Sequence, residues 1–256
     1  MPEDDSPTPP PRFELTHFQE QLQKIQESDI DCVLVGGHAV SAWAEHFLPR
    51  LEALQAFLPF LSKDLDLLLV RDEFGNAMIA FPDLIRFPQR RKPPWIPIIG
   101  RATLGEDQGF FEFIDSIKGV NSEDVFKRAL TVEFKGVPIK VIDPITLLRA
   151  KCSNLRGIEQ EDRNDRRHVE MCVWIVQGFI GEALDAVKAG SLTERDIINL
   201  LKRLAETVAT FQKFCQAQEI ALTKSFPVEA IHEAGLTKVV RYLEETLSRQ
   251  FPNLGH

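Results

Sequence analysis

The chain has 256 residues, 44% of them hydrophobic, and its 38 acidic and 30 basic side chains give a formal net charge of −8. This length and apolar content are enough to bury a core in one large domain or two modest ones. The negative charge argues against a protein whose whole surface binds nucleic acid, so such a contact would need a local basic patch or a bound metal ion.

The cysteines and the N-terminal segment bear on the cellular compartment. Cys32, Cys152, Cys172 and Cys215 are widely spaced, without CxxC pairs or zinc-like histidine intervals, which indicates neither a metal knuckle nor a disulfide framework. Residues 1–12 are acidic and proline-rich, and we expect a disordered lead rather than a secretory signal. There is no uncharged apolar segment of about 18 residues, so we expect a cytoplasmic protein without membrane contact.

The first part of the chain after the lead alternates between helix and strand patterns. Apolar residues three to five positions apart over 13–28 predict an amphipathic helix. The segment IDCVLVG (30–36) predicts a short buried strand, and GHAVSAWAEHF (37–47) predicts a helix that opens directly at its end. A further helical piece is predicted over 50–58, and SKDLDLLLV (62–70) is the second clear strand.

From residue 71 to residue 94 the pattern is irregular, and it includes a basic, proline-interrupted loop at 86–92. Strand-like segments follow, namely WIPIIGRATL (95–104), QGFFEFIDSI (108–117) and the hairpin LTVEFKGVPIKVID (130–143). The hairpin is predicted to turn at Lys135-Gly136, because lysine–glycine interrupts two alternating apolar runs.

The remainder of the chain has helical periodicity. Asp143 before Pro144 is a strong helix start, because aspartate caps free N–H groups and proline suits the first helical position. A charged helix is predicted over 159–177, and its mixed charges at Arg163, Arg166, Arg167 and His168 are typical of an exposed helix face. Three or four more helices are expected after it. The expected fold is therefore α+β: a short mixed sheet flanked by helices, then an all-helical part. The expected divisions are the disordered lead 1–12, an α/β domain 13–143 and a helical domain 144–256.

Two carboxylates stand out in the second strand. Side chains alternate along a strand, so Asp64 and Asp66 are expected on one face, with the leucines between and after them on the other. Like charges this close repel each other unless a cation lies between them or a proton is shared. Mg²⁺ prefers such oxygen ligands and completes its coordination with phosphate oxygens. The alternative is an edge strand with a solvated polar face.

The glycine pair Gly36-Gly37 comes between a strand and a helix. A helix N-terminus offers free backbone N–H groups and the positive end of a dipole to an anion. A phosphate cradle close to metal-binding carboxylates is what phosphoryl or nucleotidyl transfer requires, because the protein must position a polyphosphate and neutralise developing charge.

These residues together resemble a known family. Gly36-Gly37 after a strand, the following helix and the segment Ser62-Lys63-Asp64-Leu65-Asp66-Leu67 are similar to the hGG…[ST]xDhDh signature of the DNA polymerase beta-like nucleotidyltransferase superfamily. The GGxA form at residues 36–39 is most similar to small bacterial members of the abortive-infection and toxin–antitoxin type. The likeness extends to VPIKVIDPITLLRAKCSNL and covers roughly residues 30–175.

The resemblance implies roles for particular residues. Asp64 and Asp66 would bind Mg²⁺ (or Mn²⁺) together with a nucleoside triphosphate. A third carboxylate is expected on a later strand, where Glu112 and Asp115 are candidates on opposite faces. Glu112 is preferred because related chains carry their acid seven residues before the glycine that Gly119 matches. It would hold a second metal ion and help to activate the acceptor. A further set would contact the nucleotide: Gly36, Gly37, His38, Ser41 and Lys151.

The same resemblance leaves the acceptor open between a tRNA 3′ end, a protein hydroxyl and a small molecule such as an aminoglycoside, and a toxin role would predict an antitoxin partner. The basic loop residues Arg86, Arg90, Arg91 and Lys92 would suit an RNA backbone, or would simply be solvated.

This chain departs from the family in three ways: Gly37 and Asp64 lie 27 positions apart, more than is usual; glycine replaces the frequent serine of the phosphate turn; and the preferred third acid is glutamate in place of aspartate. They favour one alternative, a catalytically degenerate interaction or regulatory module. A kinase-like phosphotransferase on the same metal ions is another.

Overall fold

The structure is a computed structural model, and it describes residues 11–86, 98–104, 107–160, 163–252 and 254. At its centre is a seven-stranded mixed sheet in the order β3-β4-β5-β2-β1-β7-β6. Its strands are β1 Cys32–Leu34, β2 Asp64–Leu69, β3 Ile85–Arg86, β4 Ile98–Leu104, β5 Asp107–Ile114, β6 Leu130–Phe134 and β7 Val137–Val141. The predicted lead therefore lies mostly outside the described residues.

The middle of the sheet carries its only parallel pairings among the described strands. β2 is antiparallel to β1 and parallel to β5, and β1 is parallel to β7. The remaining pairs, β3–β4, β4–β5 and β6–β7, are antiparallel. The antiparallel pair β1–β2 and the parallel pair β2–β5 bring β1, β2 and β5 side by side, although residues 70–106 separate the second of these strands from the third.

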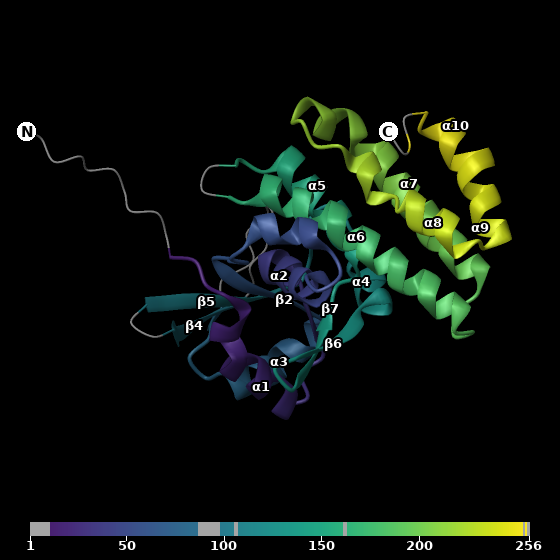
Figure 1. The fold of residues 1–256 in the computed structure, drawn as a ribbon. Helices are drawn as coiled ribbons and strands as arrows, with labels where there is room; N and C mark the ends of the chain where they lie inside the picture. The colour runs from purple at the N-terminus through teal and green to yellow at the C-terminus, as the bar shows by residue number, and fades with distance from the viewer. Residues whose placement is uncertain (1–10, 87–97, 105–106, 161–162, 253, 255–256) are drawn as a thin grey trace, which may run out of the picture.

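Helices pack around the sheet and form most of the described C-terminal part of the chain. In the first half they are α1 Gln19–Glu27, α2 Gly36–Phe47, α3 Phe74–Ala80 and α4 Ser122–Arg128, with 3-10 turns at Leu15–Phe18, Glu52–Phe57 and Arg71–Glu73. In the second half they are α5 Pro144–Gly157, α6 Asp165–Lys188, α7 Glu194–Ala217, α8 Val228–Ala234, α9 Thr237–Tyr242 and α10 Ser248–Gln250, with a 3-10 turn at Leu222–Ser225 and a π-helical segment at Leu243–Leu247. Figure 1 shows the helices α7 to α10 gathered away from the strands. The predicted α+β class with a helical C-terminal part is confirmed.

The hydrophobic core runs without a break through both parts of the chain. Trp43 on α2 is buried and donates a hydrogen bond from Nε1 to the carbonyl oxygen of Ile142, 2.8 Å away, just before α5 begins. No helix of the described part of the chain has the length and apolar character needed to cross a membrane. The domain boundary at residue 143 stays a prediction.

Several elements differ from their sequence-based predictions. The helix expected over 50–58 is only the 3-10 turn Glu52–Phe57. The irregular stretch after β2 contains the short helix α3, and a second unpredicted helix, α4, begins where the Asn121 side chain accepts hydrogen bonds from the N–H groups of Glu123 and Asp124. The charged helix predicted over 159–177 is α6, which begins later and runs to Lys188.

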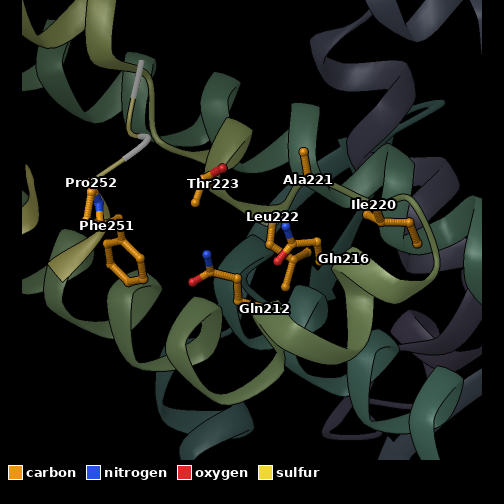
Figure 2. A pocket seen from close by; sticks show the side chains of 8 residues that line it. All are labelled: Gln212, Gln216, Ile220, Ala221, Leu222, Thr223, Phe251 and Pro252. Atoms are coloured by element: carbon orange, nitrogen blue, oxygen red, sulfur yellow. The ribbon is translucent and has the colours of Figure 1, made fainter. Parts of the chain in front are cut away.

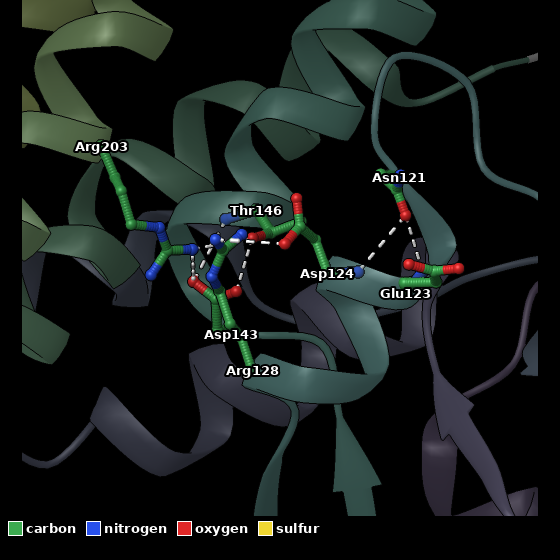
Figure 3. Close-up of polar contacts among 7 residues, drawn as sticks. All are labelled: Asn121, Glu123, Asp124, Arg128, Asp143, Thr146 and Arg203. Atoms are coloured by element: carbon green, nitrogen blue, oxygen red, sulfur yellow. Dashed lines mark hydrogen bonds and ion pairs between the residues drawn. The ribbon is translucent and has the colours of Figure 1, made fainter.

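The hairpin and the helix start at Asp143 are confirmed. β6 and β7 turn at Lys135-Gly136, both with positive φ. The Asp143 carboxylate accepts a hydrogen bond from the N–H of Thr146 at 3.3 Å and caps α5. Arg203 of α7 reaches the same group, 2.8 Å from Asp143 Oδ1 and 2.9 Å from Thr146 Oγ1 (Figure 3). The capping residue therefore also ties α7 to the start of α5.

Candidate functional site

The carboxylates of β2 lie on one face of the sheet. Leu65 and Leu67 are buried, whereas Asp64 and Asp66 are only partly buried, as the alternation predicts. β5 runs alongside in parallel, in a register that places Glu112 opposite Asp66. Paired residues of neighbouring strands project to the same side, so three acids share this face. We call it the carboxylate face.

The structure separates the two candidates for the third acid. Glu112 lies within β5, whereas Asp115 lies one residue beyond the end of that strand, where it accepts a hydrogen bond from Ser116 Oγ at 3.1 Å. Glu112 is therefore the acid that the sheet brings beside Asp66.

Burial and mutual repulsion shape the protonation of all three acids. Burial raises the pKa of Glu112 to about 8, and the charges of Asp66 and Asp64 add to the effect. Burial likewise raises the pKa of Asp66 to about 6, against an opposing contribution from Lys151, and raises that of Asp64. These carboxylates carry an electrostatic cost that a bound cation would relieve.

The diglycine turn lies directly against Asp66. Val35 donates its N–H to the Asp66 carbonyl oxygen at 2.9 Å, and Gly36 follows with φ +67°. A Cβ at Gly36 would lie 1.8 Å from Asp66 Oδ2, and one at Gly37 would lie 2.0 Å from Ser62 Oγ. A side chain at either position would collide with a neighbouring residue, so both positions require glycine. Gly36 is also required because its backbone is left-handed.

The turn opens α2 with its backbone donors uncapped. Helix α2 begins at Gly36, and Val35, its N-cap residue, offers no side-chain acceptor to the first N–H groups. Such donors and the positive end of the helix dipole attract an anion. These uncapped N–H groups therefore adjoin the Asp66 carboxylate.

The two other candidates on α2 lie in the interior. His38 is fully buried, with its ring edge-on to Phe18 at 5.1 Å between centroids, and neither ring nitrogen has a hydrogen-bond partner among the described residues. Burial lowers its pKa to about 3. Ser41 is buried too and donates to the carbonyl oxygen of Gly37 in its own helix at 3.4 Å. The His38 and Ser41 side chains therefore lie in the interior and support the diglycine turn.

Lys151 belongs to an ionic cluster in which the lysine and its aspartate partner are buried. It is only 5% exposed, and its Nζ lies 3.5 Å from Oδ1 of Asp165, which is 2% exposed. Arg163 binds the other oxygen of Asp165 at 2.6 Å. Lys151 and Arg163 also act favourably on the ionised Asp66, so the cluster borders the carboxylate face.

The start of α6 corrects one sequence-based interpretation. The mixed charges at Arg163, Arg166, Arg167 and His168 indicated an exposed helix face. Arg166 fits this, because it is exposed and pairs with Glu170. His168, however, is buried with Nδ1 unpartnered among the described residues, and its Cε1 would lie 3.2 Å from a Cβ at Gly37. The first turns of α6 thus pack against the diglycine turn. The local charge pattern of these turns is the same as that of a solvated helix.

The donor set fits a hard divalent cation whose coordination is shared with a substrate. Within the described residues, no three His, Cys, Asp or Glu side chains form a ready-made metal cage. Mg²⁺ is commonly held by one or two carboxylates, waters and substrate phosphates instead of such a cage. The pair Asp64 and Asp66, next to uncapped N–H groups, offers that incomplete ligand set.

The pocket shown in Figure 2 is separate from these residues. Its volume is 120 Å³, and it lies between α7 and the segments 220–223 and 251–252 of the helical part. The basic loop predicted at 86–92 lies outside the described residues, apart from the backbone of Arg86 at the end of β3.

Comparison with known proteins adds the following. No protein-family model and no curated protein sequence matches this chain. The solved structures that are similar to it include the following two. One is an antigenic nucleotidyltransferase-like protein from Paracoccidioides brasiliensis, 14% identical, with a TM-score of 0.43 over 82% of this chain and 96% of that one. The other is the antibiotic-resistance factor ANT(2'')-Ia, 12% identical, with a TM-score of 0.44 over 80% of this chain and 94% of that one.

Proposed function

We propose that this protein is a metal-dependent nucleotidyltransferase that moves a nucleoside monophosphate from a nucleoside triphosphate to an acceptor hydroxyl. The observation that carries the proposal is the contact between Gly36 and Asp66, which brings an uncapped helix N-terminus against a paired carboxylate. An anion site and a cation site in contact suit a metal-bound polyphosphate.

The residues have distinct tasks in this proposal. Mg²⁺, held by Asp64 and Asp66, would neutralise phosphate charge and polarise the phosphorus that is attacked. The α2 N–H groups would hold the distal phosphates. Glu112, which lies opposite Asp66 in the register of the sheet, would hold a second metal ion and help to activate the acceptor hydroxyl. Lys151, held by Asp165, would balance negative charge near Asp66.

The test is a transfer assay on the full chain. Each α-labelled nucleoside triphosphate is incubated with Mg²⁺ or Mn²⁺ and with total RNA or cell protein, and labelled acceptor is counted. Asp64→Asn and Asp66→Asn should each reduce transfer by at least about 100-fold, because each removes a charge needed at the transferred group. Asp72→Asn is the matched control, since Asp72 is an exposed aspartate just beyond the same strand.

The outcome separates this proposal from its alternatives. Release of pyrophosphate with label on the acceptor supports nucleotidyl transfer. Release of a nucleoside diphosphate, with transfer of a γ-label, identifies a kinase-like phosphotransferase. Absence of transfer with either metal ion and every acceptor pool identifies a degenerate module. An antitoxin partner and a cytoplasmic location stay predictions.

A further inference from the structure

An exposed aromatic ring lies next to the acids. In the register of the sheet, Phe110 of β5 is opposite Asp64, two residues before Glu112, and so it shares the carboxylate face. Phe110 is 38% exposed, whereas its neighbour Phe111, on the opposite face, is 3% exposed and packs against Phe81 with ring centroids 5.0 Å apart. The chain therefore buries one phenylalanine and leaves the adjacent one in solvent beside the site.

A cation accompanies this ring. Arg101 of β4 is opposite Phe110 on the other side, and its guanidinium carbon lies 6.0 Å from the centroid of the ring. Arg101 is itself exposed, so its charge is available to a ligand. Arg101, Phe110 and Asp64 thus form one row across three adjacent strands, each about 5 Å from the next.

We propose that Phe110 and Arg101 form an acceptor platform that binds the terminal nucleotide of a single-stranded RNA, the base stacking on Phe110 and the backbone phosphate meeting Arg101. This deepens the proposed function and rests on it. Aromatic rings next to arginine are how proteins hold unpaired bases, since every base has a flat π-face and every nucleotide carries an anion.

The position of the row suits the acceptor better than the triphosphate. The diglycine turn approaches Asp66 from β1, on one side of β2, whereas Phe110 and Arg101 lie on the other side, on β5 and β4. A base stacked on Phe110 would leave its ribose next to Glu112, the group proposed to help activate the acceptor hydroxyl. The guanidinium also disfavours a polycationic acceptor such as an aminoglycoside, because like charges repel.

The test compares two labelled oligoribonucleotides that differ only at the 3′-terminal residue, which carries a base in one and is abasic in the other. Binding is measured by fluorescence anisotropy without nucleoside triphosphate, and transfer by kcat/KM. The wild-type chain should prefer the intact oligonucleotide by about 5- to 150-fold. Phe110→Ala should abolish that preference, and Phe110→Trp should retain it. Arg101→Gln should weaken binding of both oligonucleotides and lower the salt dependence by about one phosphate contact.

Ile79→Ala is the matched control, because Ile79 is an 81% exposed apolar side chain on α3 and should leave both measurements unchanged. Equal use of the two oligonucleotides by the wild-type chain, or an unchanged preference in Phe110→Ala, would overturn the platform while leaving nucleotidyl transfer intact. Labelling confined to protein or to an aminoglycoside would overturn it as well. If no acceptor is labelled at all, the proposed function fails, and the anisotropy comparison alone decides for or against the platform.

Discussion

The backbone of Gly36 and the carboxylate of Asp66 are packed so closely that no side chain fits between them: a Cβ at position 36 would lie 1.8 Å from Asp66 Oδ2. Gly36 also has φ +67°, a conformation that L-residues with a side chain adopt at a cost of about 1–2 kcal/mol. The diglycine turn and the Asp66 carboxylate are therefore one steric unit.

Gly36→Ala should abolish transfer and lower the free energy of unfolding by more than backbone strain accounts for. The added methyl group must displace Asp66 or open the turn. Either change separates the N-terminus of α2, the proposed anion site, from the Asp66 carboxylate, the proposed cation site. Chemical denaturation and the transfer assay measure the two effects.

Gly235→Ala is the control for this prediction. Gly235 has nearly the same φ, +65°, but no atom lies within 4 Å of a Cβ at that position. Its substitution should cost only the strain, about 1–2 kcal/mol, and leave transfer unchanged. Equal losses of stability in the two variants would contradict the steric account.

The raised pKa of Glu112 predicts a stability that falls with rising pH. The ordinary value of 4.5 applies to the unfolded chain and about 8 to the folded one, so between these values the folded state binds more protons. Unfolding free energy must then decrease as pH rises through this window, by at least about 1 kcal/mol between pH 5 and pH 8. Glu112→Gln should flatten the profile, and Mg²⁺ should stabilise the wild-type chain more at pH 8 than at pH 5. A flat wild-type profile would argue against a Glu112 pKa that is raised by burial and by the charges of Asp66 and Asp64.

Strand alternation was sufficient to place the acids. Side chains alternate along a strand, so Asp64 and Asp66 lie on one face whatever surrounds the strand. Equally local rules predict the helix start at Asp143-Pro144 and the hairpin turn at Lys135-Gly136. The pairing of β2 with β5, which brings Glu112 beside Asp66, depends on contacts across more than 40 residues, and the preference for Glu112 came from resemblance and not from the strand pattern.

The sequence could not reveal the ionic cluster. Lys151 lies on α5 and Asp165 at the start of α6, and an alternating charge pattern is the same whether a helix end is solvated or buried against another helix. The short helix α3 has too few residues for a periodic pattern to emerge. α4 did carry a readable signal, because Asn121 before Ser-Glu-Asp is a favourable N-cap sequence.

Breaking the ion pair at Asp165 should destabilise the protein strongly. Asp165 neutralises both Lys151 and Arg163, so Asp165→Asn leaves a buried lysine without its anion and should cost about 3–5 kcal/mol. Lys151→Met should cost less stability, because Asp165 keeps its ion pair with Arg163. In urea unfolding, the double variant should lose less than the sum of the two single losses.

An exposed pair provides the comparison for this prediction. Lys140 Nζ and Asp31 Oδ1 are closer, at 2.7 Å, but both side chains are about half exposed to water. Asp31→Asn should therefore cost no more than about 1 kcal/mol, since solvent screens the charges. If the exposed pair proved the costlier to break, burial would not be what makes the Lys151 pair important.

His38 should act on stability and not on nucleotide binding. Its pKa is lowered from 6.5 to about 3 by burial, so between these values the unfolded chain binds more protons and unfolding free energy falls as the pH drops. His38→Leu removes two buried nitrogens without partners among the described residues; it should therefore stabilise the protein by roughly 1 kcal/mol at neutral pH and flatten the acid side of the profile. The KM for nucleoside triphosphate should stay within about twofold, because the ring faces Phe18 in the core. His232→Gln, on the exposed side of α8, should change neither stability profile nor KM. A tenfold higher KM in His38→Leu would instead assign this histidine to the phosphate site.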